Sequence, residues 1–185
     1  MKFLRILILF FIFQFALNIH AQVYLPNAKT CDENSIGLGI GQDFGGIGIG
    51  VLHYGGNKNM GIFGGIGYTP AGIGFNGGLK LRLIPSNRTA TVNPFILGMY
   101  GYTTAISVTN YTQYNKTFYG STLGGGFDLK LRKSSRGFWT LALLFPIDNS
   151  KANEYIQYLK VDQGITFSTE QSSLRCSIGY RYLLN

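Results

Sequence analysis

The stretch at residues 72–84, GIGFNGGLKLRLI, alternates between two kinds of side chain. Glycine, Asn76, Lys80 and Arg82 occupy one set of alternate positions. Apolar residues occupy the other set: Ile73, Phe75, Leu79, Leu81 and Leu83. Because successive side chains of a β-strand point to opposite faces, this period of two predicts a strand with one apolar and one polar face. A strand of this length also suffices to cross a bilayer at a tilt. Whether the apolar face meets a protein core or lipid therefore decides the class of protein.

The same alternation recurs and predicts eight strands, at 35–41, 46–54, 60–68, 72–84, 95–104, 118–132, 138–145 and 172–184. Only 95–104 is partly apolar on both faces, so its orientation stays open. Glycine-, asparagine- and proline-rich turns separate the strands, among them 43–45, and 151–162 has the caps and spacing of a helix. The fold class that follows is all-β: an eight-stranded antiparallel up-and-down barrel with a short helix in the last long connection, 146–171.

Residues 1–21 have the order of a secretory signal peptide. Lys2 and Arg5 precede an apolar run at 6–17, and the segment ends on the small residue Ala21. The apolar run is shorter than the about 20 residues of a membrane-spanning helix, so we expect cleavage after Ala21. The predicted organisation is a signal peptide at 1–21, an N-terminal tail at 22–34 and a β-barrel domain at 35–185.

Composition and loop lengths favour lipid for the apolar face. Charged residues make up only 13% of the chain, about half the usual fraction, and 26 residues are glycine. Glycines on the polar face would make room for larger neighbours inside a narrow barrel, whose interior side chains must fill. The two longest connections, 107–117 and 146–171, would lie at the end opposite the chain termini, as in transmembrane barrels. Aromatic residues near the strand ends are candidates for interfacial girdles: Tyr54, Tyr68, Trp139, Tyr180 and Tyr182.

With its export signal, strand number, alternation and loop asymmetry, the chain resembles the small eight-stranded outer-membrane β-barrels, of the OmpX-like or OmpA-transmembrane-domain type. The resemblance is architectural and rests on no specific motif. It implies a transmembrane barrel in the outer membrane of a Gram-negative bacterium, in contact with the lipid bilayer and outer-membrane lipids and inserted by the outer-membrane assembly machinery. The expected role is non-enzymatic, either structural or in binding a surface ligand whose identity stays unknown.

Charged residues on the polar face form the candidate site. The tetrapeptide LKLR occurs at 79–82 and again at 129–132, each time at the end of a predicted strand. In a barrel these cations would point inward near the periplasmic end. Because buried charges need partners, we expect a hydrated interior network, with Asp43 or a loop as a further partner. An anion or headgroup site is the alternative. The predicted network comprises Lys80, Arg82, Asp128, Lys130, Arg132 and Arg181.

Few other residues carry chemistry. Cys31 and Cys176 flank opposite ends of the barrel, roughly 25 Å apart at about 3.3 Å per residue, which predicts two free thiols. His53 is the single histidine after residue 21, so we assign no catalytic residue, metal or cofactor. The net charge of +8 comes without a cluster of cations and aromatics in a loop, and we expect no nucleic acid partner.

Two other classes of protein stay open. A soluble secreted lipocalin-like barrel that binds an apolar ligand would reverse the faces. Leu79 and Leu81 would then line its cavity, while Lys80 and Arg82 would meet water. A barrel enzyme acting on lipid would need an acid or a serine, such as Ser35 or Ser172, beside His53.

Overall fold

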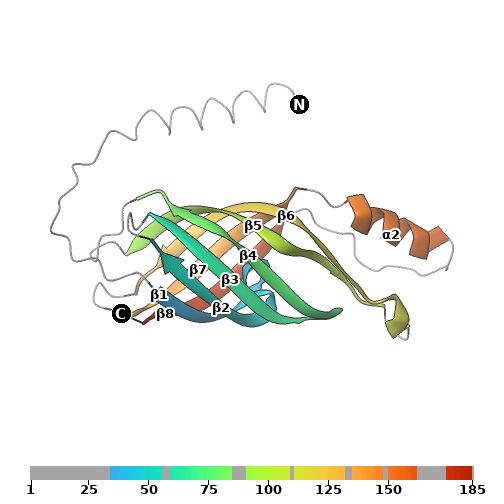
Figure 1. Cartoon of the computed structure of the whole chain (residues 1–185), viewed down its shortest axis with the longest axis horizontal. Helices are drawn as coiled ribbons and strands as arrows, with labels where there is room; N and C mark the ends of the chain where they lie inside the picture. Colours follow the sequence, from blue (N-terminus) through green and yellow to red (C-terminus); the bar gives the residue numbers. More distant parts are fainter. Residues whose placement is uncertain are drawn as a thin grey trace, which may run out of the picture.

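The strands of this chain close into an eight-stranded barrel in the computed structural model (Figure 1). The structure describes residues 34–55, 59–84, 91–108, 111–131, 135–147, 150–161 and 174–184. The order of strands around the wall is their order in the sequence, and antiparallel pairing of β1 with β8 closes the barrel. The predicted all-β meander barrel is therefore confirmed. The predicted signal peptide, Cys31 and Arg132 lie outside the described residues.

The strands and helices follow the predicted boundaries within a few residues, and only β5 is markedly longer than predicted. The elements are β1 (Asn34–Gly41), η1 (Gln42–Phe44), β2 (Gly46–Tyr54), β3 (Met60–Thr69), β4 (Gly72–Arg82), β5 (Val92–Ile106), η2 (Thr112–Tyr114), β6 (Lys116–Leu129), β7 (Gly137–Pro146), α2 (Ser150–Val161) and β8 (Arg175–Leu183). The predicted helix is confirmed as α2. No helix in the described part of the chain has the length and apolar character needed to traverse a membrane.

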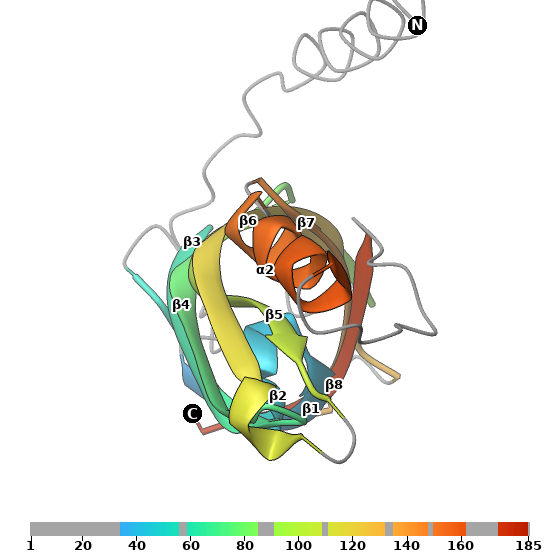
Figure 2. The same ribbon diagram turned by 90° about the vertical axis from the view of Figure 1, so that its right-hand side faces the viewer.

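The two ends of the barrel differ. We call the end where Asn34 and Leu183 lie the terminal end, and the opposite one the loop end. At the loop end the β5–β6 hairpin projects beyond its neighbours, and the longest connection carries α2, which lies beyond the end of the barrel on the side of β6 and β7 (Figures 1 and 2). The connection at 107–115 is no longer than that at 83–91 on the terminal end. Longer strands therefore carry the β5–β6 connection outward.

The outer wall is apolar and the lumen is polar in strand β4. Leu79 and Leu81 are 51% and 40% exposed, whereas Lys80 and Arg82 are 3% and 4% exposed. This is the reverse of a lipocalin-like arrangement. The same holds around the wall, where exposed apolar side chains include Ile36, Leu38, Ile40, Ile47, Ile49, Val51, Ile62, Ile66, Ile73, Phe75, Ile96, Leu123, Phe127, Leu141, Leu143, Phe145 and Ile178.

Strand β5, whose orientation the sequence left open, turns Ile96 and Tyr100 outward. Its other face joins side chains of β2, β3 and β7 in the apolar cluster of the lumen: Leu52, Tyr54, Phe63, Phe95, Leu97, Met99, Ala142 and Leu144. Tyr54 is therefore buried, and its assignment to an exposed aromatic girdle was wrong. The other girdle candidates, Tyr68, Trp139, Tyr180 and Tyr182, are exposed.

Candidate functional site: the filled lumen

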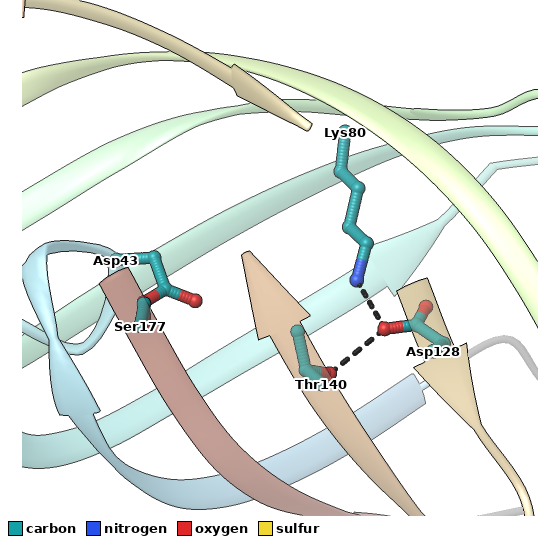
Figure 3. Close-up of polar contacts among 5 residues, drawn as sticks. All are labelled: Asp43, Lys80, Asp128, Thr140 and Ser177. Atoms are coloured by element: carbon teal, nitrogen blue, oxygen red, sulfur yellow. Dashed lines mark hydrogen bonds and ion pairs between the residues drawn. The ribbon is translucent and has the colours of Figure 1, made fainter. Parts of the chain in front are cut away.

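Strands β4 and β6 bring an ion pair into the lumen near the terminal end. Lys80 Nζ lies 2.7 Å from Asp128 Oδ1, and both side chains are almost fully buried. Thr140 on β7 donates a hydrogen bond to the same carboxylate oxygen at 2.8 Å (Figure 3). Lys80 Nζ also lies 3.7 Å from the ring centroid of Phe95. The pair therefore connects three strands across the lumen.

Two of the described arginines on the inner face, Arg82 and Arg181, stack on aromatic rings. Arg82 Cζ lies 3.6 Å from the ring centroid of Tyr54, and Arg181 Cζ lies 4.8 Å from that of Phe44. A desolvated cation–π contact stabilises by about 2 kcal/mol. Nε and Nη1 of both arginines are buried without a hydrogen-bond acceptor among the described residues. The Tyr54 ring is buried in the lumen, where the Arg82 guanidinium packs on its face.

The turn between β1 and β2 folds into the lumen, a feature that the sequence did not predict. Residues 43–45 were expected to form a turn, and they do, but η1 points inward and Phe44 is 0% exposed. Gly41 and Gly45 have φ angles of 142° and 75°, which other residues rarely adopt. Gly39 and Gly179 leave the space that the Phe44 ring occupies, since a Cβ at either position would overlap the ring.

Polar contacts hold η1 in place. Gln42 Nε2 donates to the Tyr102 carbonyl at 2.7 Å and to Thr122 Oγ1 at 3.2 Å, and the Asn76 side-chain amide donates to the Gln42 carbonyl. The Ser177 hydroxyl donates to the Asp43 carboxylate beside it (Figure 3). The positive charges of Arg181 and Lys80 also act on Asp43. The turn is thus tied to four strands, β4, β5, β6 and β8.

Five of the six residues predicted for the interior network line the lumen or its terminal end. Lys80, Arg82, Asp128, Lys130 and Arg181 are all at most 6% exposed. Arg132, the sixth, lies outside the described residues. Sequence reasoning missed the contribution of η1, especially Gln42 and Phe44. The one available signal was the glycine-flanked sequence GQDFGG at 41–46, which allows unusual backbone angles on both sides of a buried aromatic residue.

The described residues give no sign of the catalytic arrangement that a barrel hydrolase needs. His53 is exposed on the outer wall, with Nδ1 2.7 Å from Asn34 Oδ1, whereas Ser35 is buried on the other face. Ser172 lies outside the described residues. In the described ranges no group of three or more His, Cys, Asp or Glu side chains converges to hold a metal ion. Cys176 is an exposed free thiol, as predicted.

A second cluster, at the loop end, joins α2 to the β5–β6 hairpin. Leu159 of α2 packs with Ile106 and Val108, and Tyr155 Oη donates to the Tyr114 carbonyl at 3.1 Å. Partial burial raises the pKa of the Tyr155 hydroxyl, and the neighbouring tyrosines add to the rise. Lys116 Nζ lies 4.8 Å from the Tyr155 ring centroid. The helix is therefore packed against the hairpin on one face.

These features define an up-and-down β-barrel with an apolar outer wall and a lumen filled by both apolar and charged side chains. Among solved structures, the chain is similar to the N-terminal β-barrel domain of Pseudomonas aeruginosa OprF, with a TM-score of 0.47 and 9% sequence identity. The match covers 83% of this chain and 98% of that one. No protein-family model matches the chain, and no curated protein matches it significantly.

Proposed function

We propose that this chain is an integral β-barrel of the outer membrane, without enzymatic activity, whose role is structural or in binding at the surface. The observation that carries the proposal is the outer wall. A water-soluble protein rarely exposes an apolar patch larger than a few hundred Å². Here exposed isoleucine, leucine or phenylalanine side chains occur on all eight strands, while the cations on the inner face, Lys80, Arg82, Lys130 and Arg181, are buried.

Strand geometry supports the same proposal. A transmembrane strand needs about 9–11 tilted residues, and β2, β3, β4 and β7 have 9, 10, 11 and 10. The closed barrel pairs every strand on both sides, so no sheet edge faces lipid. The bilayer and its lipids are then the first partners of the barrel, and insertion requires the outer-membrane assembly machinery.

Any binding of a surface ligand would take place at the loop end of the barrel. The β5–β6 hairpin and α2 project there, with exposed aromatic side chains at Tyr111 and Tyr158. By analogy with outer-membrane barrels, the long connections face outward and the chain termini face the periplasm. The surface ligand is not specified by these residues.

Substitution of the outer wall tests the proposal. Ile66 lies in the interior of β3 and Met60 begins the same strand, and both are exposed on its outer face. We expect Ile66→Arg to destabilise the barrel in lipid by about 2–4 kcal/mol and Met60→Arg by about 0–1 kcal/mol, because the cost of a cation falls toward the interface. Urea unfolding in lipid vesicles measures both values.

Fractionation supplies the companion measurement. The wild-type chain, exported in a Gram-negative host, should stay in the membrane pellet after a carbonate wash and migrate faster on a gel before boiling. Release into the soluble periplasm, with Ile66→Arg as stable as wild type in water, would refute the proposal and favour a soluble barrel.

A further inference from the structure

Because the chain turns into the lumen at η1, β1 ends before β8 does at the loop end of the barrel. The last β1–β8 pair joins Ile40 to Ile178, and β8 continues for three more residues to Arg175. A hollow of about 480 Å³ opens there, which we call the rim notch. Its lining includes Ile40, Ile47, Tyr68, Tyr102, Ala105 and Arg175.

The rim notch has an apolar side and a polar side. Ile40, Ile47 and Tyr68 belong to the outer wall and are 59%, 66% and 66% exposed. Tyr102 and Arg175 come from the inner side of β5 and β8, where alternation with the exposed Cys176 turns Arg175 inward. The notch therefore joins the outer wall to the upper part of the lumen.

Arg175 brings a cation to the notch. Its Nη2 donates to Thr104 Oγ1 at 2.9 Å, and its Nε is buried without an acceptor among the described residues. The lumen carboxylates are engaged elsewhere, Asp128 with Lys80 and Asp43 with Ser177. A guanidinium in this state is complementary to a phosphate group, whose oxygens accept from its planar N–H donors.

An apolar groove continues from the notch along the outer wall. A second hollow of about 490 Å³ shares Ile40 and Ile47 with the rim notch and extends to Trp139 and Tyr180. Leu38, Ile49 and Ile178 also line it. A cation at the rim with an apolar groove leading away from it matches a charged headgroup attached to an acyl chain.

We propose that the rim notch is a binding site for a membrane lipid with an anionic phosphate headgroup. Arg175 donates to the phosphate, and one acyl chain lies in the groove over Ile40 and Ile47. Charge complementarity selects an anionic over a zwitterionic lipid, because the notch presents a cation for which the described residues supply no matching carboxylate. The inference rests on the proposed membrane location.

Lipid retention by the intact barrel tests this site. The full chain is placed in phosphatidylcholine nanodiscs that contain a minor fraction of phosphatidylglycerol, and the lipid that it retains is identified by native mass spectrometry. We expect wild type to retain phosphatidylglycerol over phosphatidylcholine by about tenfold, because both phosphates accept from Arg175 but only the choline group adds a positive charge that the guanidinium repels. Arg175→Gln should lose this preference. Arg136→Gln, at an exposed arginine on the terminal end, should keep it.

Two further variants distinguish the effect of the Arg175 charge on lipid retention from the effect of the space in the rim notch. Ala105→Phe should block the notch and reduce retention with Arg175 intact, and Arg175→Lys should keep part of the preference. The gel shift before boiling verifies that each variant is folded. Equal retention of both lipids by wild type, an unchanged preference in Arg175→Gln, or full displacement by inorganic phosphate would overturn the lipid site. Recovery of the chain outside the nanodiscs would instead contradict the proposed membrane location.

Discussion

The two halves of the lumen are filled in different ways. Toward the terminal end, strand side chains such as Phe95, Lys80 and Asp128 occupy the space. Toward the loop end, glycines occupy many inward positions, and a turn of the main chain enters to bring Phe44 between them. The comparison teaches that a narrow barrel can be packed either from its walls or by an inserted turn, and that glycine content decides which.

The largest loss of stability is expected at the buried ion pair between Lys80 and Asp128, whose side chains come from the strands of the barrel wall. Asp128→Ala leaves Lys80 in the lumen without its carboxylate, and breaking a buried pair in this way costs about 3–5 kcal/mol. The free energy of unfolding in urea, measured on the barrel in lipid vesicles, gives the loss.

The double variant Lys80→Met/Asp128→Leu is the control for this pair. It removes both charges and keeps apolar volume, so we expect most of the lost stability to return. A double variant as unstable as Asp128→Ala would mean that Asp128 matters through Thr140 and the packing around it instead of through Lys80.

The second effect concerns the inserted turn. A Cβ at Gly50 would lie 3.2 Å from the Phe44 ring, so Gly50→Ala should destabilise the wild type by about 1–2 kcal/mol. The same substitution in a Phe44→Ala background should cost less, because the ring is gone while the Arg181 guanidinium and the Gly64 carbonyl oxygen, each 3.3 Å from that Cβ, remain. Urea unfolding of the four proteins in this cycle yields the coupling energy.

If the losses of stability from Gly50→Ala and Phe44→Ala were additive, Gly50 would not be needed to make room for the Phe44 ring. Outer-wall Phe75→Ala replaces Phe44→Ala in a control cycle with Gly50→Ala. Phe75 is exposed and lies on β4, and we expect its coupling to Gly50 to be within about 0.5 kcal/mol of zero.

The smallest effect on the barrel is expected outside the lumen. Leu159 is fully buried between α2 and the β5–β6 hairpin, in a cluster separate from the lumen. Leu159→Ala should raise proteolysis at the loop end several-fold but change barrel unfolding by less than about 0.5 kcal/mol, since local units open independently. Val161→Ala, at an exposed apolar residue on α2, serves as the matched control. A large loss of barrel stability would mean that α2 and the lumen unfold together.

Alternation in the sequence was enough to predict the part of the lumen that the walls fill. A period of two assigns Lys80 and Asp128 to the inner face without knowledge of the fold, because adjacent positions are clearly apolar. The same rule could not orient β5, where Phe95 and Ile96 are both apolar. It also misplaced Tyr54, because a tyrosine near a strand end fits an interfacial position as well as a stack with Arg82.

The inserted turn could not be predicted in the same way. Residues 43–45 have turn chemistry, and that chemistry fixes neither the inward nor the outward direction. The direction depends on space left by Gly39 and Gly179, which are far apart in the sequence and meet only after β1 pairs with β8. Local sequence therefore predicts the bend, and long-range packing decides where it points.

The inserted turn also bears on permeation. Phe44 lies between glycines of β1 and β8, and Arg181 stacks on its ring from the terminal side. An ion that travelled the length of this lumen would have to displace an aromatic ring, its stacked cation and the hydrogen bonds of Gln42. If the barrel lies in a membrane as proposed, this filling predicts that solutes on its two sides stay separated.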